Sequence, residues 1–261
     1  MKVTIIGGGN MGGSIARGLS KSSPVEAGSI TVVDINPQLL DALKKECPAI
    51  QISTNSHEAV KKAGIVIVAL KPYLVESLLT EIQQAIENDA IIISVAAGIT
   101  FAQIRSWIDA IRPNPLFRVI PNTAIAVGQS MTLIAADNAT DNQVEAIEKL
   151  FVQMGATAII SENLMSAGTA LASCGIAYAF RYIRAATQGA VEMGIAPATA
   201  KGMVLQTLKG AVALLEANNS HPEEEIDKVT TPGGITIKGL NEMENAGFTP
   251  AVIRGLKASK I

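Results

Sequence analysis

Short apolar runs alternate with helix-like stretches over the first 160 residues of the chain. The runs are almost continuously apolar, which is typical of strands covered on both faces, as in a parallel sheet. Between them, Asn55, Thr100 and Thr140 are each followed three positions later by Glu or Gln, a signal for the start of a helix. The candidate strands are residues 3–6, 30–33, 65–69, 91–95 and 117–120. Repeated strand–helix–strand units predict an α/β fold, a doubly wound parallel sheet over residues 1–161.

The pattern changes after about Ser161, where strand-like runs end and helical segments follow. Residues 162–261 are therefore predicted to form a second, all-helical domain. Its helices are rich in Ala and Gly and more apolar than a bundle of this size usually buries, so we expect a homodimer through this half. Residues 163–180 carry no charge, but their small and polar residues favour a buried helix over a membrane span. The predicted helices are 163–192, 196–217, which opens at Pro197, 233–246 and 249–259.

Composition excludes several classes of function. The 261 residues have a formal net charge of −2 and only 3% aromatic residues, which argues against a nucleic-acid partner. Two Cys and two His are too few to build a disulfide framework or a metal cage by themselves, so we expect no metal. No secretion signal is visible, because Gly7 interrupts the apolar start of the chain. We expect a cytoplasmic protein that binds a small molecule and no membrane.

A glycine-rich string follows the first predicted strand and precedes a predicted helix. Residues 7–12, Gly-Gly-Gly-Asn-Met-Gly, fit the pattern G-x-G-x-x-G. In this setting the glycines permit a tight turn, close approach of a pyrophosphate and helix–strand packing, and the helix N-terminus presents free N–H groups to phosphates. We predict dinucleotide binding, with a purely structural turn as the alternative. The expected contacts are Gly7, Gly9, Asn10, Met11 and Gly12.

Asp34, at the end of the second predicted strand, bears on the choice of cofactor. A carboxylate at this place accepts hydrogen bonds from the ribose hydroxyls of NADH. The 2′-phosphate of NADPH would meet it as a like charge, at a cost of about 4 kcal/mol at ~4 Å and intermediate dielectric. No Arg or Lys lies between Asp34 and Asp41 to receive such a phosphate. The residues favour NADH, unless Asp34 only caps the turn at Asn36-Pro37.

Loops after the other predicted strands can complete a nicotinamide cleft at the carboxyl edge of the sheet. Small residues after the predicted strand at 91–95 would let a flat ring lie on the backbone, and Asn122 could hydrogen-bond to a carboxamide. Each loop alone is also consistent with an ordinary turn, and Lys71 with a solvated lysine. The expected cofactor contacts from these loops are Asn55, Ala69, Leu70, Lys71, Pro72, Val95, Ala96, Ala97 and Asn122.

A second candidate site lies near the C-terminus. The string Thr231-Pro232-Gly233-Gly234 leads into a predicted helix that begins with Ile235-Thr236. Unpaired N–H groups at such a helix start form an anion nest, and the hydroxyls of Thr231 and Thr236 can add hydrogen bonds. A small carboxylate would fit there. A helix start preceded by a glycine turn, with no ligand, is an equally good interpretation.

The string at residues 230–236 resembles the signature of Δ1-pyrroline-5-carboxylate reductases. Further blocks similar to that family's occur in the same order along essentially the whole chain: residues 7–12, 69–72, 94–99, 118–123, 169–171, 177–178 and 206–207. The resemblance implies a Rossmann domain joined to a helical domain that dimerises by interlocking, often within a ring of dimers. It also implies hydride transfer from NADPH or NADH to the C=N carbon of a cyclic imino acid, which gives L-proline.

The resemblance further implies roles for individual residues. The substrate carboxylate would lie on the backbone of residues 234–236, namely Gly234, Ile235 and Thr236, with Thr231 and Gly233 beside it. A protonated imine is already electrophilic, so orientation can supply much of the catalysis. The sequence offers no evident general acid, and Thr236 and Tyr178 are the candidate proton donors.

Departures from the family pattern affect the expected specificity. Ile235 stands where many members have Thr, residues 172–176 differ from the usual Ser-Gly-Ser-Gly-Pro, and Arg184 replaces a frequent Glu. Most members favour NADPH, whereas Asp34 favours NADH, so both cofactors remain candidates.

Two other functions remain open. A β-hydroxyacid-type dehydrogenase also joins a Rossmann domain to helices, but it needs an acid/base group, typically a Lys on the long helix after the domain boundary. Residues 163–200 contain no Lys. A non-catalytic dinucleotide sensor is the third hypothesis, and it predicts NADH binding without oxidation when the cyclic imine is added.

Overall fold

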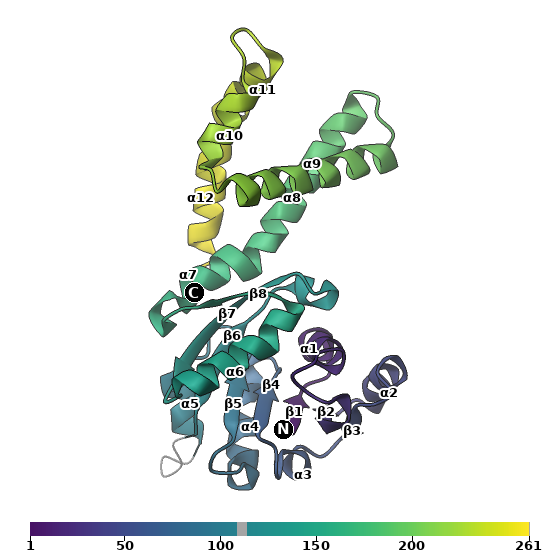
Figure 1. Cartoon of the computed structure of the whole chain (residues 1–261), viewed down its shortest axis with the longest axis vertical. Coiled ribbons are helices and arrows are strands. Elements are labelled where there is room, and N and C mark those ends of the chain that lie inside the picture. The colour runs from purple at the N-terminus through teal and green to yellow at the C-terminus, as the bar shows by residue number, and fades with distance from the viewer. Residues whose placement is uncertain (109–113, 261) are drawn as a thin grey trace. The chain divides into compact units, whose positions relative to one another are not determined.

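The computed structural model describes residues 1–108 and 114–260. The chain divides into two compact units, Met1–Ser173 and Cys174–Ser259, which are described separately (Figure 1). Every helix within the described residues is too short or too polar to span a membrane.

The first unit is built on one eight-stranded sheet. Its strand order is β3 (Gln51–Ser53), β2 (Ile30–Val33), β1 (Val3–Ile6), β4 (Ile65–Val68), β5 (Ile91–Ser94), β6 (Leu116–Ile120), β7 (Ser130–Asp137) and β8 (Gly155–Ile159). Neighbouring strands are parallel except β6 and β7, which are antiparallel. The direction of winding reverses between β1 and β4, so the predicted doubly wound fold is confirmed. The antiparallel β6–β7 pair was not predicted.

Helices cover both faces of this sheet, which explains its apolar strands. In β1, Val3 and Ile5 belong to one core cluster and Ile6 to the other, because successive side chains of a strand point to opposite faces. One face is covered by α1 (Asn10–Ser20), α2 (Pro37–Glu46) and α6 (Asp141–Phe151). The other is covered by α3 (Ser56–Val60), α4 (Pro72–Ile82), α5 (Phe101–Trp107) and α7 (Met165–Gly168). Short 3₁₀ turns lie at Ala27–Ser29, Gln83–Ala85, Thr123–Val127, Val152–Met154 and Glu162–Leu164.

The helix-start signals read from the sequence are confirmed. The Asn55 side chain accepts a hydrogen bond from the N–H of Glu58 at 3.0 Å. Thr100 and Thr140 each form a reciprocal capping box with the Gln three positions later. These caps fix where α3, α5 and α6 begin.

A π-helix, Thr169–Cys174, lies at the end of the first unit, where the sequence predicted one uninterrupted helix. It is bonded to the loop after β6: Asn122 Nδ2 donates to the carbonyl oxygen of Ala172 (3.3 Å), and Ser173 Oγ donates to that of Pro121 (3.2 Å). π-helical turns are rare in proteins, and those that do occur are frequently found at functional sites. The two bonds fix the last turn of the first unit on the carboxyl edge of its sheet.

The second unit is all-helical, as predicted. It consists of α8 (Gly175–Glu192), α9 (Pro197–Asn218), α10 (Pro222–Val229), α11 (Ile235–Asn245) and α12 (Phe248–Ala258). The helices α8 and α9 pack against each other as a hairpin, and Pro197 occupies the first turn of α9 as expected (Figure 1). Of residues 174–259, all of which the structure describes, Ala200 alone is buried. A single copy of this unit therefore has almost no core of its own.

Candidate active site

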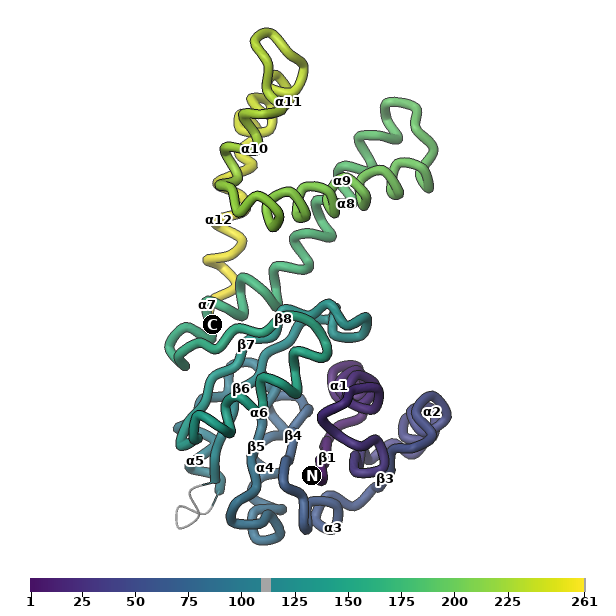
Figure 2. The backbone as a smooth tube through the Cα atoms, in the orientation of Figure 1, coloured from purple at the N-terminus to yellow at the C-terminus, as the bar shows by residue number. Residues whose placement is uncertain are grey.

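The glycine loop lies between β1 and α1, as the sequence predicted (Figure 2). Gly7 has a φ of +102°, and a Cβ there would lie 2.4 Å from the carbonyl oxygen of Ala69. A Cβ on Gly12 would lie 1.9 Å from the carbonyl oxygen of Gly7, so glycine is required at both positions. A Cβ on Gly9 would meet no atom of the described residues within 4 Å, which leaves open space above the loop.

The start of α1 is suited to an anion. Gly9 is the N-cap residue and provides no side-chain cap, so the N–H groups of Asn10, Met11 and Gly12 have no intrahelical partner. These N–H groups and the helix dipole are what a pyrophosphate requires. Together with the open space at Gly9, they show that the loop fits a dinucleotide.

Asp34 connects two parts of this edge of the sheet. Its Oδ2 accepts a hydrogen bond from the N–H of Gly8 (2.8 Å), and its Oδ1 accepts one from the N–H of Asn36 (2.9 Å). The turn contact considered from the sequence therefore exists, together with a second bond to the glycine loop. Because an ionised carboxylate has about four acceptor positions, Asp34 can also accept hydrogen bonds from ribose hydroxyls.

The other expected cofactor residues lie in the loops that follow β3, β4, β5 and β6, except Pro72, which is the first residue of α4. Since β1 to β6 are parallel, these loops share the carboxyl edge of the sheet with the glycine loop. Lys71 is exposed and is the N-cap residue of α4, with Pro72 in its first turn. Ala96 is buried and Ala97 is exposed. Leu70 also lines a pocket, described below.

Both polar atoms of the Asn122 side chain form hydrogen bonds within the protein. Its Oδ1 accepts a hydrogen bond from the N–H of Ala124 (3.0 Å), and its Nδ2 donates to Ala172. A bond from Asn122 to a carboxamide would therefore use the second hydrogen of Nδ2 or the second lone pair of Oδ1. The structure gives this residue a clear role in fixing the loop after β6.

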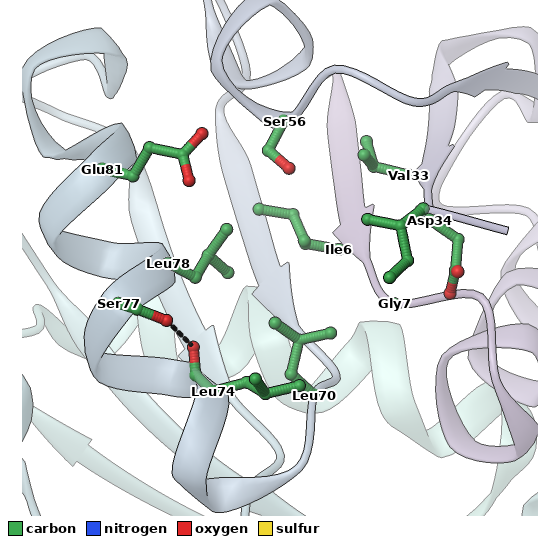
Figure 3. Close-up of a pocket in the computed structure, with 11 residues that line it drawn as sticks. Ile6, Gly7, Val33, Asp34, Ser56, Leu70, Leu74, Ser77, Leu78 and Glu81 are labelled. Carbon is green, nitrogen blue, oxygen red and sulfur yellow. Dashed lines mark hydrogen bonds between the residues drawn. The ribbon is translucent and has the colours of Figure 1, made fainter.

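A pocket of about 230 Å³ lies beside Asp34 (Figure 3). Gly7, Asp34 and Leu70 were predicted to contact the cofactor, and the pocket brings all three together. Sequence analysis did not find its other lining residues: Ile6, Val33, Ile35, Ser56, Leu74, Ser77, Leu78 and Glu81. The detectable signal was the helical spacing of residues 74, 77, 78 and 81, which places them on one face of α4.

In the second unit, residues 231–234 form a tight turn that leads into α11. The N–H of Gly234 donates to the carbonyl oxygen of Thr231 (2.9 Å), and Gly233 has a φ of +73°. Pro in the second position and a glycine with positive φ in the third are the features of a type II turn. Among the three amides expected to hold a carboxylate, that of Gly234 is thus used within the turn.

The free amides of this site belong to the first turn of α11. Gly234 is the N-cap residue, without a side-chain cap, so the N–H groups of Ile235 and Thr236 lack intrahelical partners. Thr231 and Thr236 are exposed. An anion can therefore reach both amides and both hydroxyls of this segment.

Tyr178, a candidate proton donor, has partners within the second unit. Its hydroxyl is hydrogen-bonded to the hydroxyl of Ser259 and to the carbonyl oxygen of Gly255, the latter at 3.3 Å. These contacts join α8 to the end of α12. Thr236, the other candidate, lies in α11.

Strong charge pairing occurs at the surface of the chain. The largest effect is on Glu225, where hydrogen bonds from Lys228, Ser220 and Asn218 lower the pKa to about 2. Within residues 1–108 and 114–260, no three His, Cys, Asp or Glu side chains are grouped as metal ligands.

The strand order, the glycine loop at the start of α1 and the carboxylate at the end of β2 define a Rossmann-type, dinucleotide-binding protein. Two family models match the chain. Residues 162–260 match a model described as pyrroline-5-carboxylate reductase dimerisation, and residues 2–98 match one described as NADP oxidoreductase coenzyme F420-dependent.

Individual proteins agree with these matches. The chain is 41% identical to pyrroline-5-carboxylate reductase 1 of Dictyostelium discoideum over 98% of its length, and it spans 48% of that relative. It is 40% identical to pyrroline-5-carboxylate reductase 2 of the same organism, over 98% of this chain and 90% of that relative. The crystal structure of Plasmodium falciparum pyrroline carboxylate reductase with NADP bound has the same fold, with a TM-score of 0.90, 23% identity and coverage of 99% and 95%. The chain belongs to the pyrroline-5-carboxylate reductase family.

Proposed function

We propose that the protein reduces 1-pyrroline-5-carboxylate to L-proline, the last step of proline biosynthesis. The reduction is a hydride transfer from NADPH or NADH to the C=N carbon of the cyclic imine. Membership of the family supports this function. The observation that carries it is the start of α11, where two free amides follow a rigid glycine turn and can hold a small carboxylate.

The first unit supplies the cofactor site. The bound dinucleotide provides the hydride. The amides of Asn10, Met11 and Gly12 hold its pyrophosphate, Asp34 accepts hydrogen bonds from the adenosine ribose, and the pocket beside Asp34 takes the adenine. Asp34 favours NADH over NADPH because a 2′-phosphate would lie against a carboxylate.

The second unit supplies the substrate site. The carboxylate of the imino acid accepts hydrogen bonds from the N–H groups of Ile235 and Thr236, and the hydroxyl of Thr231 adds to them. The bond within the turn, from Gly234 to Thr231, keeps these groups in place. Of the two candidate proton donors we favour Thr236, because the Tyr178 hydroxyl is already bonded within its unit.

We also propose an organisation for the whole chain. Residues 1–161 form the dinucleotide-binding domain, and residues 162–261 form the substrate-binding and dimerisation domain. A homodimer, alone or in a ring of dimers, would cover the apolar side chains that one copy of the second unit leaves exposed. The two cysteines are free thiols, which suits the reducing cytoplasm. Light scattering during size exclusion measures the assembly.

Replacing Ile235 by proline tests the substrate site, because it deletes one N–H group and keeps the helix. Proline is well accepted in the first turn of a helix, where Ile235 lies. Gly234, with φ −64° and ψ 167°, already has the extended conformation that a residue before proline needs. A lost hydrogen bond to a charged group predicts a KM for 1-pyrroline-5-carboxylate about tenfold higher or more.

Ile235→Ala is the matched control, because it shortens the same side chain and keeps the N–H group. We expect its KM to remain near that of the natural protein, and both variants to bind NADH normally. Equal KM values for the two variants would remove this amide from the substrate site. A protein that binds NADH but never oxidises it when the cyclic imine is added would be a dinucleotide sensor instead.

A further inference from the structure

The α4 wall of the pocket beside Asp34 carries the carboxylate of Glu81. Glu81 lies on α4 and lines the pocket with Leu74, Ser77 and Leu78. In Figure 3 its side chain extends from α4 towards the pocket, across from the wall of Val33 and Asp34. Within residues 1–108 and 114–260 the carboxylate forms neither a hydrogen bond nor an ion pair. Its oxygens are therefore available to a ligand.

The rest of the pocket is suited to a flat, largely apolar group. Leu70, Leu78 and Val33 provide apolar walls, and the side chain of Ile35 is 94% exposed at the rim. None of the 11 residues that line the pocket is Lys, Arg or His. Such a pocket favours a ring with hydrogen-bond donors at its edge and disfavours a group that adds negative charge.

The polar groups on α4 are acceptors. The hydroxyl of Ser77 donates to the carbonyl oxygen of Leu74 at 3.2 Å, which leaves the Ser77 oxygen free to accept. Glu81, one turn further along the helix, is an acceptor when ionised. A ligand that fills the pocket must therefore present N–H or O–H groups towards α4.

We propose that Glu81 determines the base specificity of the cofactor site by accepting a hydrogen bond from the exocyclic amino group of adenine. The proposal rests on the proposed function, which places the adenosine half of the dinucleotide beside Asp34. Adenine has a flat ring for the apolar walls and an amino group for the carboxylate. A purine with a carbonyl oxygen in place of that amino group would set oxygen against oxygen at Glu81.

Equilibrium binding of two reduced dinucleotides tests the proposal without substrate. NADH is compared with reduced nicotinamide hypoxanthine dinucleotide, in which a carbonyl replaces the adenine amino group. Because Glu81 is exposed to solvent, we use the lower end of the range of free energies for a hydrogen bond to a charged group. The natural protein is then expected to bind NADH about tenfold more tightly, measured as Kd from the nicotinamide fluorescence.

Three variants on α4 identify the cause. Glu81→Ala should bring the ratio of the two Kd values close to one, mainly by weakening NADH, and Glu81→Gln should keep part of the preference through its amide oxygen. Glu76→Ala is the matched control, because Glu76 is exposed on the same helix and does not line the pocket. Its ratio should equal that of the natural protein.

The proposal would be overturned by a natural protein that binds both dinucleotides equally, or by a Glu81→Ala variant that keeps the full preference. The outcome is separable from that of the proposed function, because binding needs no turnover. A chain that discriminates between the bases but does not reduce the imino acid would sustain the role of Glu81 and refute the reductase activity. A chain that reduces the imino acid but binds both dinucleotides equally well would sustain the reductase activity and refute the role of Glu81.

Discussion

Replacing Glu162 by alanine should destabilise the first unit, because it removes the ion-pair partner of the buried Arg118. One oxygen of Glu162, Oε1, accepts hydrogen bonds from Nη1 of Arg118 at 2.9 Å and from the N–H of Phe101 at 2.6 Å. Arg118 lies in β6, and Phe101 is the first residue of α5. The carboxylate therefore joins a central strand, the start of a helix and the segment that leads into α7.

The expected cost follows from the burial of the two side chains. The Arg118 side chain is 8% exposed, and its buried Nε has no hydrogen-bond partner among the residues that the structure describes, so removing Glu162 leaves a poorly solvated cation. Breaking a fully buried pair costs roughly 3–5 kcal/mol. Glu162 is 36% exposed, which lets water reach the cation and reduces the cost. Glu162→Ala also removes a favourable anion at the start of α5. We therefore expect the free energy of unfolding to fall by about 3 kcal/mol in total.

The single tryptophan of the chain provides the assay. Trp107 is the last residue of α5 and packs partly buried against the core, so its fluorescence reports on the helix whose start Glu162 holds. Urea unfolding of the full chain should show a lower midpoint with an unchanged slope. With a slope of about 1–3 kcal/mol/M, a loss of about 3 kcal/mol moves the midpoint by at least about 1 M.

Two further variants test the reasoning. Glu145→Ala removes an exposed carboxylate paired with Lys149 and should leave the urea midpoint close to that of the natural protein. The double variant Arg118→Met/Glu162→Ala should be more stable than Glu162→Ala alone, because the unpaired charge is gone. If Glu162→Ala unfolds within about 0.5 kcal/mol of the natural protein, the ion pair does not stabilise this unit.

Two other predictions concern the cofactor and pH. Asp34→Ser should weaken the binding of NADH and improve that of NADPH, because it removes a like charge near the 2′-phosphate. We expect the ratio of the two Kd values to shift by about tenfold or more. An unchanged ratio would mean that Asp34 serves only its bonds to Gly8 and the following turn. Lys228 and Ser220 help to lower the pKa of Glu225 to about 2 from an ordinary 4.5, so the stabilisation is complete above about pH 4.5 and is lost as the pH falls towards 2. Circular dichroism of the natural chain should show helix stability falling across that range, whereas Glu225→Gln should lack this component; parallel acid profiles would contradict the assignment.

Much of the fold could be predicted because the strands of the first unit are buried on both faces. Their near-continuous apolar runs distinguish them from surface strands, and the capping residues mark the helices between them. The edge strand β3 was missed because it has only three residues, none of them buried. Strand β7 was missed although it is mostly buried, and its antiparallel pairing with β6 is a long-range contact that local periodicity does not encode.

The candidate site was predictable where the backbone itself forms it. Gly7 and Gly12 are required by contacts within one strand–loop–helix segment, which is why a short motif reveals them. The wall formed by Leu74, Ser77 and Glu81 could not be identified in the same way, because only the topology of the sheet brings α4 beside Asp34. The partners of Tyr178 lie about 80 residues further along the chain, at a distance that no sequence spacing indicates.

The near absence of buried side chains in Cys174–Ser259 has a consequence for how the molecule is made. A newly synthesised chain can complete its first unit alone, since that unit buries its own apolar residues. Completing the helical half is, under the proposed dimer, an encounter between two chains, so its rate rises with their concentration. At low concentration we expect the chains to remain partly folded monomers with an ordered sheet and exposed helices. The yield of the dimer should therefore depend on the expression level.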